Sequence, residues 1–209
     1  NGVLFLDELP EFRSDVLEVL RQPLEDGQAQ ITRSAGTVVY PSRFMLVCAM
    51  NPCRCGWFGH PSGRCTCTDS QVQSYLRRIS GPLLDRIDMH VEVPSVEYEA
   101  MRRKEQPESS QQVRSRVNAA RQAQQRRYEG TGVTCNAYMT PAMIGQYCQL
   151  DTAGEKLMQG AFDRLGLTGR SHDRILRMAR TIADLEGEAQ ILPAHLAEAI
   201  QYRSSAMLK

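Results

Sequence analysis

The chain has 209 residues, of which 42% are hydrophobic and 23% charged, and its formal net charge is +1. These values are typical of a globular protein with one large or two small domains, and they exclude a chain that attracts nucleic acid or membrane through its overall charge. No apolar run approaches the roughly 20 residues that span a bilayer, and no signal peptide is recognisable. An odd count of seven cysteines favours a reducing compartment, so we expect a cytoplasmic protein.

The chain begins with "NGVLFLDELPEF", in which four apolar residues, Val3 to Leu6, precede two carboxylates, Asp7 and Glu8. An apolar run without alternation predicts a strand buried on both faces, as in a parallel sheet covered by helices. Apolar residues at helical spacing follow, and Ser14 is a candidate N-cap for that helix. A proline and an Asp-Gly pair are expected to end it.

Three further segments have strand character. The stretch "QITRSAGTVVY" predicts a hairpin, because β-branched residues flank a Ser-Ala-Gly turn. Phe44–Met50 is a second apolar run, and a polar residue, Asn51, follows it. Arg86–Val93 alternates in polarity and predicts a third strand.

The pattern becomes helical from Gln111 onward. Helices are expected at 111–128, 141–149, 152–165, 171–185 and 193–202. The predicted fold class is therefore α/β plus α, a partial parallel-sheet core with a β-hairpin followed by a helical bundle. The expected organisation is an α/β part at 1–94, a connecting segment and helix at 95–135, and the bundle at 136–209.

The acidic pair at the end of the first strand matches the Walker B pattern of ATPases. An aspartate at the carboxyl edge of a parallel sheet faces the crevice where ligands bind, so Asp7 is a candidate ligand for Mg²⁺. The next carboxylate, Glu8, is placed to polarise an attacking water. The alternative is an acidic turn without a catalytic role, which is common at strand ends.

Asn51 and three arginines are the other candidate site residues. An amide at the end of the second strand can hold a water or a γ-phosphate oxygen, although Asn-Pro pairs also form ordinary turns. Arg86 is either a surface salt-bridge partner or an arginine finger that reaches a neighbouring subunit's nucleotide. Arg170 precedes a helix, where it either binds a phosphate or is simply solvated, and Arg174 lies one turn further on.

Four cysteines are concentrated in "CRCGWFGHPSGRCTC". Four thiolates at this density can close a tetrahedral zinc site, and the three glycines allow the loop to fold back on itself. His60 is an alternative ligand, and four free thiols are the alternative without a metal. The candidate ligands of Zn²⁺ are Cys53, Cys55, Cys65 and Cys67.

In chain order, these features resemble the Walker B, sensor 1, arginine finger and sensor 2 motifs of AAA+ ATPases. The strings "GVLFLDELPEF", "YPSRFMLVCAMNPCRCG", "SGPLLDRID" and "RILRMARTIADLEG" resemble the magnesium-chelatase-like proteins of bacteria, of the YifB or ComM type. The resemblance implies the C-terminal part of an AAA+ module, with sensor 1 at Asn51 and sensor 2 at Arg170 or Arg174 in a helical lid. It implies ATP and Mg²⁺ as cofactors.

For ComM-type members the resemblance implies a hexameric ring that remodels branched DNA during natural transformation. In related motors a hairpin before sensor 1 projects into the ring's pore, which makes Arg33 a candidate DNA contact. A rival within the family is a chelatase subunit that drives metal insertion into a porphyrin. A non-enzymatic alternative is a zinc-stapled module that binds nucleic acid or protein.

The sequence departs from the family pattern in one respect. No G-x-x-x-x-G-K-[ST] occurs in it, so the loop that cradles the phosphates is absent. The chain also begins directly with a strand and not with Met. We therefore expect that an N-terminal part of the protein is missing, and that these 209 residues alone do not hydrolyse ATP.

Overall fold

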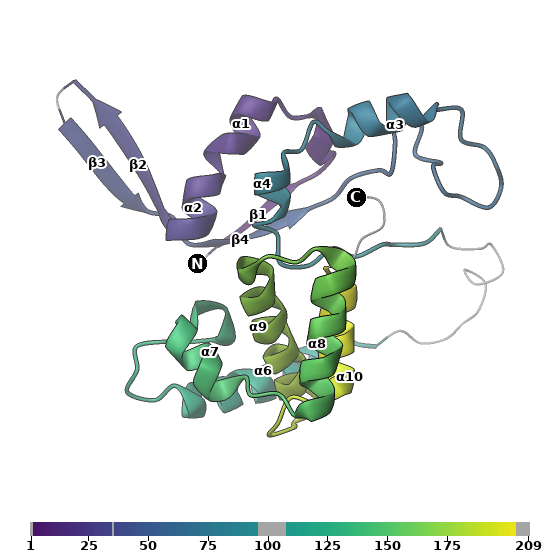
Figure 1. The fold of residues 1–209 in the computed structure, drawn as a ribbon. Coiled ribbons are helices and arrows are strands. Elements are labelled where there is room, and N and C mark those ends of the chain that lie inside the picture. Colours follow the sequence, from purple (N-terminus) through teal and green to yellow (C-terminus); the bar gives the residue numbers. More distant parts are fainter. Residues whose placement is uncertain (1, 35, 96–107, 204–209) are drawn as a thin grey trace. The chain divides into compact units, whose positions relative to one another are not determined.

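The computed structural model describes residues 2–34, 36–95 and 108–203 (Figure 1). The chain divides into two compact units, Asn1–Ile87 together with Ala206–Lys209, and Asp88–Ser205. Most of the predicted connecting segment, at 96–107, lies outside the described residues.

The first unit is a mixed α/β structure. Its strands are β1 (Gly2–Leu6), β2 (Gln28–Arg33), β3 (Gly36–Pro41) and β4 (Phe44–Cys48). Its helices are η1 (Leu9–Glu11), α1 (Ser14–Val19), α2 (Arg21–Asp26), α3 (Asp69–Leu76) and α4 (Gly81–Leu84).

Strands β1 and β4 form a two-stranded parallel sheet, with Gly2 opposite Phe44 and Leu6 opposite Cys48. Parallel neighbours need a crossover connection, which is here built from η1, α1, α2 and the β2–β3 hairpin. The two carboxyl ends therefore lie at the same edge of the sheet, as the sequence predicted.

The prediction that the first strand is buried on both faces is wrong for the described residues. Leu6 packs into a core with the helices, but Val3 and Phe5 are 64% and 58% exposed. Their partners across the sheet, Met45 and Val47, are exposed as well. Among the described residues, helices cover only one face of this pair of strands. The apolar side chains on the other face are therefore exposed.

The helices of the first unit meet the sheet through a small apolar core. Its buried members are Leu9, Leu17, Ile79 and Leu83. Ser14 is not the N-cap of α1, because Arg13 occupies that position and the Ser14 hydroxyl donates to the carbonyl of Arg78 at 3.3 Å. Pro23 does not end the helical stretch either.

Pro23 is the third residue of α2, where the first-turn N–H groups have no helical partner and proline is tolerated. The predicted Asp-Gly pair does end this helix, because α2 stops at Asp26 and the C-cap Gly27 has a left-handed φ of 65°. Ser42 donates its N–H to the carbonyl of Gly27 at 2.7 Å and closes the base of the hairpin that follows. A side chain at Gly27 would also meet the side chain of Arg43.

The predicted hairpin is confirmed. Strands β2 and β3 pair antiparallel, with Arg33 opposite Gly36 next to the turn. Apart from Ala29, every residue of both strands is exposed, and the ribbon projects away from α2 (Figure 1).

The strand predicted at Arg86–Val93 is wrong. The described residues 86–95 contain no strand, and the N–H of His90 donates instead to the carbonyl of Tyr202, at 2.7 Å. Alternation in polarity describes a half-buried extended segment, but a strand also needs a neighbouring edge with which to pair. No described strand pairs with this segment.

The second unit is helical, in agreement with the sequence. Its elements are α6 (Ser110–Arg127), η2 (Asn136–Tyr138), α7 (Pro141–Tyr147), α8 (Thr152–Leu165), α9 (Gly169–Glu186) and α10 (Pro193–Gln201). Four of these helices start at side-chain oxygens that accept the N–H three residues on, as capping requires. These caps are Ser109, Thr140, Asp151 and Thr168.

Helix α9 forms the centre of this unit and packs against α6, α7 and α10. Its apolar residues Ile175, Ala179 and Ala183 are fully buried. Among the described helices, none is both long and apolar enough to cross a membrane.

Candidate functional site

The candidate site in the first unit lies at the carboxyl edge of β1 and β4. The pairing continues past the strands, because Ala49 donates its N–H to the carbonyl of Leu6 at 2.9 Å and Leu9 donates to the carbonyl of Ala49 at 3.0 Å. Asp7 and Glu8 are therefore held at the same sheet edge as the segment that leads to Asn51. All three side chains are exposed.

Glu8 has an unusual backbone conformation. With φ 52° and ψ 47°, it is the one described residue other than glycine with a positive φ. Left-handed geometry costs a residue with a Cβ about 1–2 kcal/mol. The buried pair Leu9 and Pro10 anchors the chain directly afterwards, so packing of η1 maintains the turn. The strain fixes the direction in which the Glu8 carboxylate leaves the sheet.

Asp7 caps this turn. One of its carboxylate oxygens, Oδ1, accepts the N–H of Glu8 at 2.9 Å. This edge thus carries three side chains with oxygen atoms: the carboxylates of Asp7 and Glu8 and the amide of Asn51. Such oxygen donors suit Mg²⁺ and a phosphate-bound water.

Sequence analysis did not identify Tyr75 of α3, whose side chain is 4% exposed. Burial raises the pKa of its hydroxyl, and the carboxylates of Glu11 and Glu8 raise it further. The main-chain N–H of Asn51 acts in the opposite direction and lowers this pKa. A tyrosine at helical spacing in "SQVQSYL" gives no sequence signal for these neighbours, because they are distant from it in sequence.

Arg86 is held inside the first unit. Its guanidinium forms an ion pair with Glu25 of α2 and donates from Nη1 to the carbonyl of Pro82 at 2.7 Å. The side chain is only 10% exposed, and its buried Nε has no hydrogen-bond partner among the described residues. The structure thus shows Arg86 in a pair within its own chain, and a contact with a neighbouring subunit would require this pair to open.

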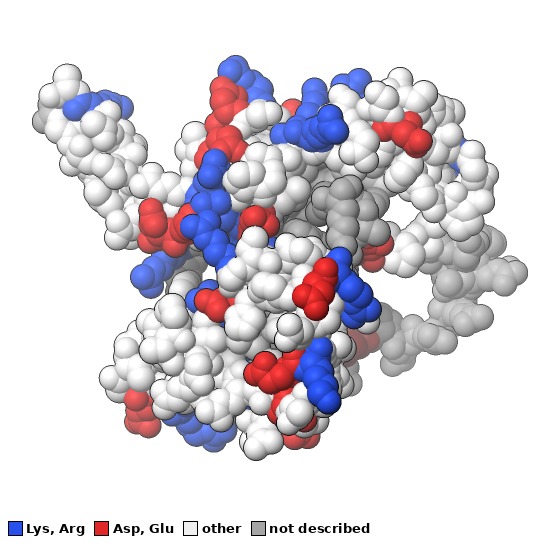
Figure 2. All heavy atoms as spheres, in the orientation of Figure 1, with Lys and Arg blue, Asp and Glu red and all other residues white. Residues whose placement is uncertain are grey.

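The hairpin carries Arg33 at its far end. Figure 2 shows basic side-chain atoms there, and Arg33 is the only Lys or Arg of Gln28–Pro41. Its side chain is exposed.

Arg170 and Arg174 belong to the second unit, and the structure does not place them relative to Asp7. Arg170 lies in the first turn of α9, after the Thr168 cap. Arg174 donates to the carboxylate of Asp88 at 2.9 Å.

The four clustered cysteines meet in space. Their sulfur atoms all lie within 4.8 Å of one another, and Cys53 is completely buried. The N–H groups of Trp57 and Thr66 lower the pKa of the Cys55 thiol to about 6. The other candidate ligand, His60, lies outside this group and shares its Nδ1 with the hydroxyl of Ser62 at 2.7 Å.

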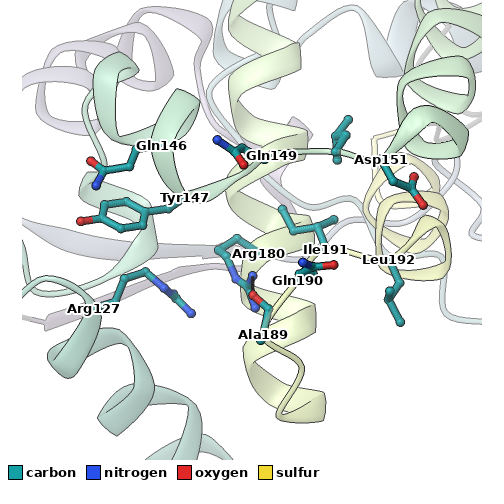
Figure 3. Close-up of a pocket in the computed structure, with 11 residues that line it drawn as sticks. Arg127, Gln146, Tyr147, Gln149, Asp151, Arg180, Ala189, Gln190, Ile191 and Leu192 are labelled. Carbon is teal, nitrogen blue, oxygen red and sulfur yellow. Dashed lines mark hydrogen bonds between the residues drawn. The ribbon is translucent and has the colours of Figure 1, made fainter.

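The second unit also contains a pocket of about 380 Å³ (Figure 3). Arg127 and Arg180 contribute to its wall, but both guanidinium groups already bind the buried Asp184. Arg180 also donates to the carbonyl of Ala189 at 2.8 Å. The arginines of this pocket therefore serve the core of the unit.

Comparison with known proteins connects these features. The family model for magnesium chelatase subunit ChlI matches residues 1–101, and the model for the C-terminal part of that subunit matches residues 107–203. Competence protein ComM of Haemophilus influenzae is 43% identical over 209 residues, which are 100% of this chain and 40% of the relative. Uncharacterized protein YifB of Escherichia coli is 42% identical over 205 residues, 98% of this chain and 39% of the relative.

A more distant relative is uncharacterized protein Rv2897c of Mycobacterium tuberculosis, 38% identical over 205 residues, 98% of this chain and 40% of the relative. The chain thus spans about 40% of the length of the curated relatives that it matches.

Proposed function

Because the chain belongs to the magnesium chelatase ChlI family, we propose that it is part of an AAA+ ATPase that couples ATP binding and hydrolysis to the remodelling of DNA. The observation that carries the proposal is the juxtaposition of Asp7, Glu8 and Asn51 at the carboxyl edge of two paired parallel strands. Ligands of open α/β sheets bind at this edge.

The exposed oxygen donors fit Mg²⁺, with Asp7 as the residue that would hold it. A bound Mg²⁺ would neutralise negative charge on the phosphate oxygens. Glu8 accepts a proton from the attacking water as that water bonds to the γ-phosphorus, while the bond from the γ-phosphorus to the bridging oxygen breaks and ADP leaves with that oxygen. Asn51 donates from its amide to the γ-phosphate and so reports whether ATP or ADP is present.

Three arginines complete the proposed cycle. Arg86 leaves Glu25 and reaches the nucleotide of the neighbouring subunit in a ring, taken here as a hexamer, where it stabilises charge in the transition state. Arg170 binds the nucleotide from the helical lid, and Arg174 is the alternative for this role.

The proposed phosphate-binding loop lies outside these 209 residues, which contain no G-x-x-x-x-G-K-[ST]. ATP hydrolysis is accordingly expected of the intact protein and not of residues 1–209 alone. None of the seven cysteines forms a disulfide, which favours the cytoplasm as the place of this activity.

DNA is the proposed substrate for two reasons. The relative from Haemophilus influenzae is named a competence protein, and Arg33 presents an exposed cation at the end of the hairpin that can bind phosphate without reading sequence. The rival substrate is a porphyrin that receives a metal ion, which the family description favours.

The test measures ATP turnover by the intact protein with and without branched DNA. Asp7→Asn is expected to abolish turnover, whereas Asp15→Asn, at another exposed aspartate of the same unit, is expected to preserve it. Stimulation by DNA supports the motor, and stimulation only by a porphyrin supports the chelatase. Full turnover by Asp7→Asn would contradict the ATP site itself and favour a non-enzymatic binding module.

A further inference from the structure

The loop between Cys53 and Cys67 brings four sulfur atoms together at spacings that suit a single metal ion. The Sγ atom of Cys53 lies 3.3 Å from that of Cys55 and 3.9 Å from that of Cys65, and the Cys55–Cys65 distance is 3.6 Å. A zinc–sulfur bond of about 2.3 Å places the sulfurs of a regular tetrahedron about 3.8 Å apart. A disulfide would need about 2.05 Å.

This loop has little else to order it. Between Cys53 and Cys67 the structure describes no helix or strand, only turns in which Gly56, His60 and Gly63 each donate an N–H to the residue three positions earlier. Gly56 and Gly63 have φ values of 79° and 64°, which a residue with a Cβ adopts only at a cost. Ordering a loop of this length costs backbone entropy at every residue, which the cross-link between its two ends can offset.

The cluster joins the loop to helix α3. Cys53 is buried in a small core with Val72, Tyr75 and Leu76, and the other three cysteines pack against this core. The last of them, Cys67, is followed at once by Thr68, which caps α3 with a reciprocal bond to Gln71. Each C-x-C pair therefore leads directly into a structured segment, one toward β4 and the other toward α3.

The charges around the cluster are compatible with four thiolates. Arg54 lies between the first two cysteines in sequence and, with Cys55 and Cys67, lines a pocket of about 420 Å³. Arg64 precedes the third cysteine and lies over the ring of Trp57, 5.1 Å from its centroid. A zinc ion with four thiolates carries a net charge of −2, and two arginines within the same loop can balance it.

We propose that Cys53, Cys55, Cys65 and Cys67 hold one zinc ion in a closed tetrahedral site that fastens the loop to α3. Four sulfur donors select zinc or iron over the oxygen-preferring cations, and a site with four protein ligands leaves no position for water, which is the mark of a structural zinc. Because Met50 packs against the core that Cys53 forms with α3, the ion also holds the segment that carries Asn51.

The geometry argues against the alternatives. All four sulfurs lie within 4.8 Å of one another, which fits a single ion better than an iron–sulfur cluster, whose thiolates bind different iron atoms. His60 is not part of the group of side chains whose ligand atoms lie within 4.8 Å of one another, so it is not among the proposed ligands.

The experiment compares metal content in the intact protein, in Cys65→Ala and in Cys48→Ala. Cys48 is a half-buried cysteine of the same unit that lies outside the cluster, so it matches Cys65 in residue type and burial. We expect the unmodified protein and Cys48→Ala each to contain one equivalent of zinc per chain. Cys65→Ala is expected to lose it. Equal zinc in both variants would overturn the proposal, as would iron in place of zinc or a disulfide among the four cysteines.

Two measurements on the unmodified protein keep the test independent of variant folding. Replacement of the metal with Co²⁺ is expected to give the visible absorption of a tetrahedral thiolate complex, and an octahedral spectrum would contradict the site. Removal of the metal by a chelator is expected to increase amide hydrogen exchange in α3, with α9 of the other unit unchanged as the internal reference. Unchanged exchange in α3 would contradict the fastening role.

Discussion

Tyr75 of helix α3 packs with Cys53 in one small apolar core, and Met50, the residue before Asn51, packs against the same core. This core connects α3 to the segment that follows strand β4. The main-chain N–H of Asn51 lowers the pKa of the Tyr75 hydroxyl, against the larger effect of burial. We therefore expect Tyr75 to position Asn51 and to act through it on the proposed nucleotide.

Tyr75→Phe is expected to reduce kcat for ATP hydrolysis about fivefold and to leave KM unchanged, because a lost hydrogen bond of about 1 kcal/mol would shift Asn51 in the transition state. Steady-state kinetics on the intact protein measure this split. Tyr138→Phe, at an exposed tyrosine of the second unit, is the matched control. An unchanged kcat in Tyr75→Phe would show that the contact does not reach the chemistry.

Glu8→Asn is expected to reduce turnover at least 100-fold, as for loss of a general base, without loss of stability. Asparagine tolerates the left-handed conformation better than glutamate does, so the free energy of unfolding should rise by up to about 1 kcal/mol. Denaturant unfolding and ATPase assays test the two effects separately. Glu11→Asn, which removes an ion pair with Arg78, should give no such gain. Lower stability of Glu8→Asn would contradict the assigned strain.

Arg86→Ala and Glu8→Gln are each expected to inactivate the ATPase, but a mixture of the two proteins should regain part of the turnover. In a ring where Arg86 acts on the neighbour's nucleotide, a Glu8→Gln subunit supplies the arginine to an Arg86→Ala subunit that retains Glu8. The measurement is ATP turnover after the subunits are mixed and reassembled. No recovery at any mixing ratio would place the action of Arg86 within its own subunit.

Asp184 is expected to make the stability of the second unit dependent on acid pH. Burial would raise the pKa of this carboxyl, but hydrogen bonds from Arg127 and Asn136 outweigh burial and hold the pKa below its usual value. A lowered native pKa stabilises the folded state fully above the unfolded value of about 3.9. That stabilisation is lost as the pH falls below this value through the native pKa.

Asp184→Asn should therefore lower the free energy of unfolding by about 3–5 kcal/mol near neutral pH, because it leaves the buried Arg180 without its charge partner. The variant should also flatten the pH dependence of stability below about pH 4, the unfolded pKa of the carboxyl. Urea unfolding across this range measures both effects, with the exposed Asp163→Asn as control. An equal slope in wild type and Asp184→Asn would assign the acid sensitivity to other groups.

Arg33→Ala is expected to weaken DNA binding and to reduce the slope of log K against log salt concentration by about 1, as for one lost phosphate contact. Titrations at several salt concentrations give the slope. Arg13→Ala, an exposed arginine outside the hairpin, should leave it unchanged. If both variants bind alike, the hairpin arginine is solvated and makes no DNA contact.

The hairpin and the helices of the second unit could be predicted from sequence because their signals are local. A Ser-Ala-Gly turn between β-branched residues specifies which residues pair across the hairpin. Capping residues mark the ends of helices, as Thr168 and Gly187 do for α9. Ser14 shows the limit of this reasoning. Its type suits an N-cap, but its hydroxyl bonds instead to Arg78, a residue distant in sequence.

The segment at Arg86–Val93 fails as a strand for a related reason. Its alternation is real, yet strand formation depends on an available edge, which is a property of the whole sheet. Likewise the sequence left Arg86 as either a salt-bridge partner or an arginine finger, and only the fold identifies Glu25 of α2 as its ion-pair partner.

The sequence by itself determined the types and order of the chemical groups: two carboxylates after an apolar run, an asparagine after the next strand, four closely spaced cysteines and an arginine at a hairpin turn. These follow from residue identity and local spacing. The tertiary structure decided which of these groups meet. The register of β1 against β4, the packing of Tyr75 against Cys53 and the convergence of the four sulfurs all depend on long-range contacts. The energies of these contacts arise only when distant segments exclude water from one another.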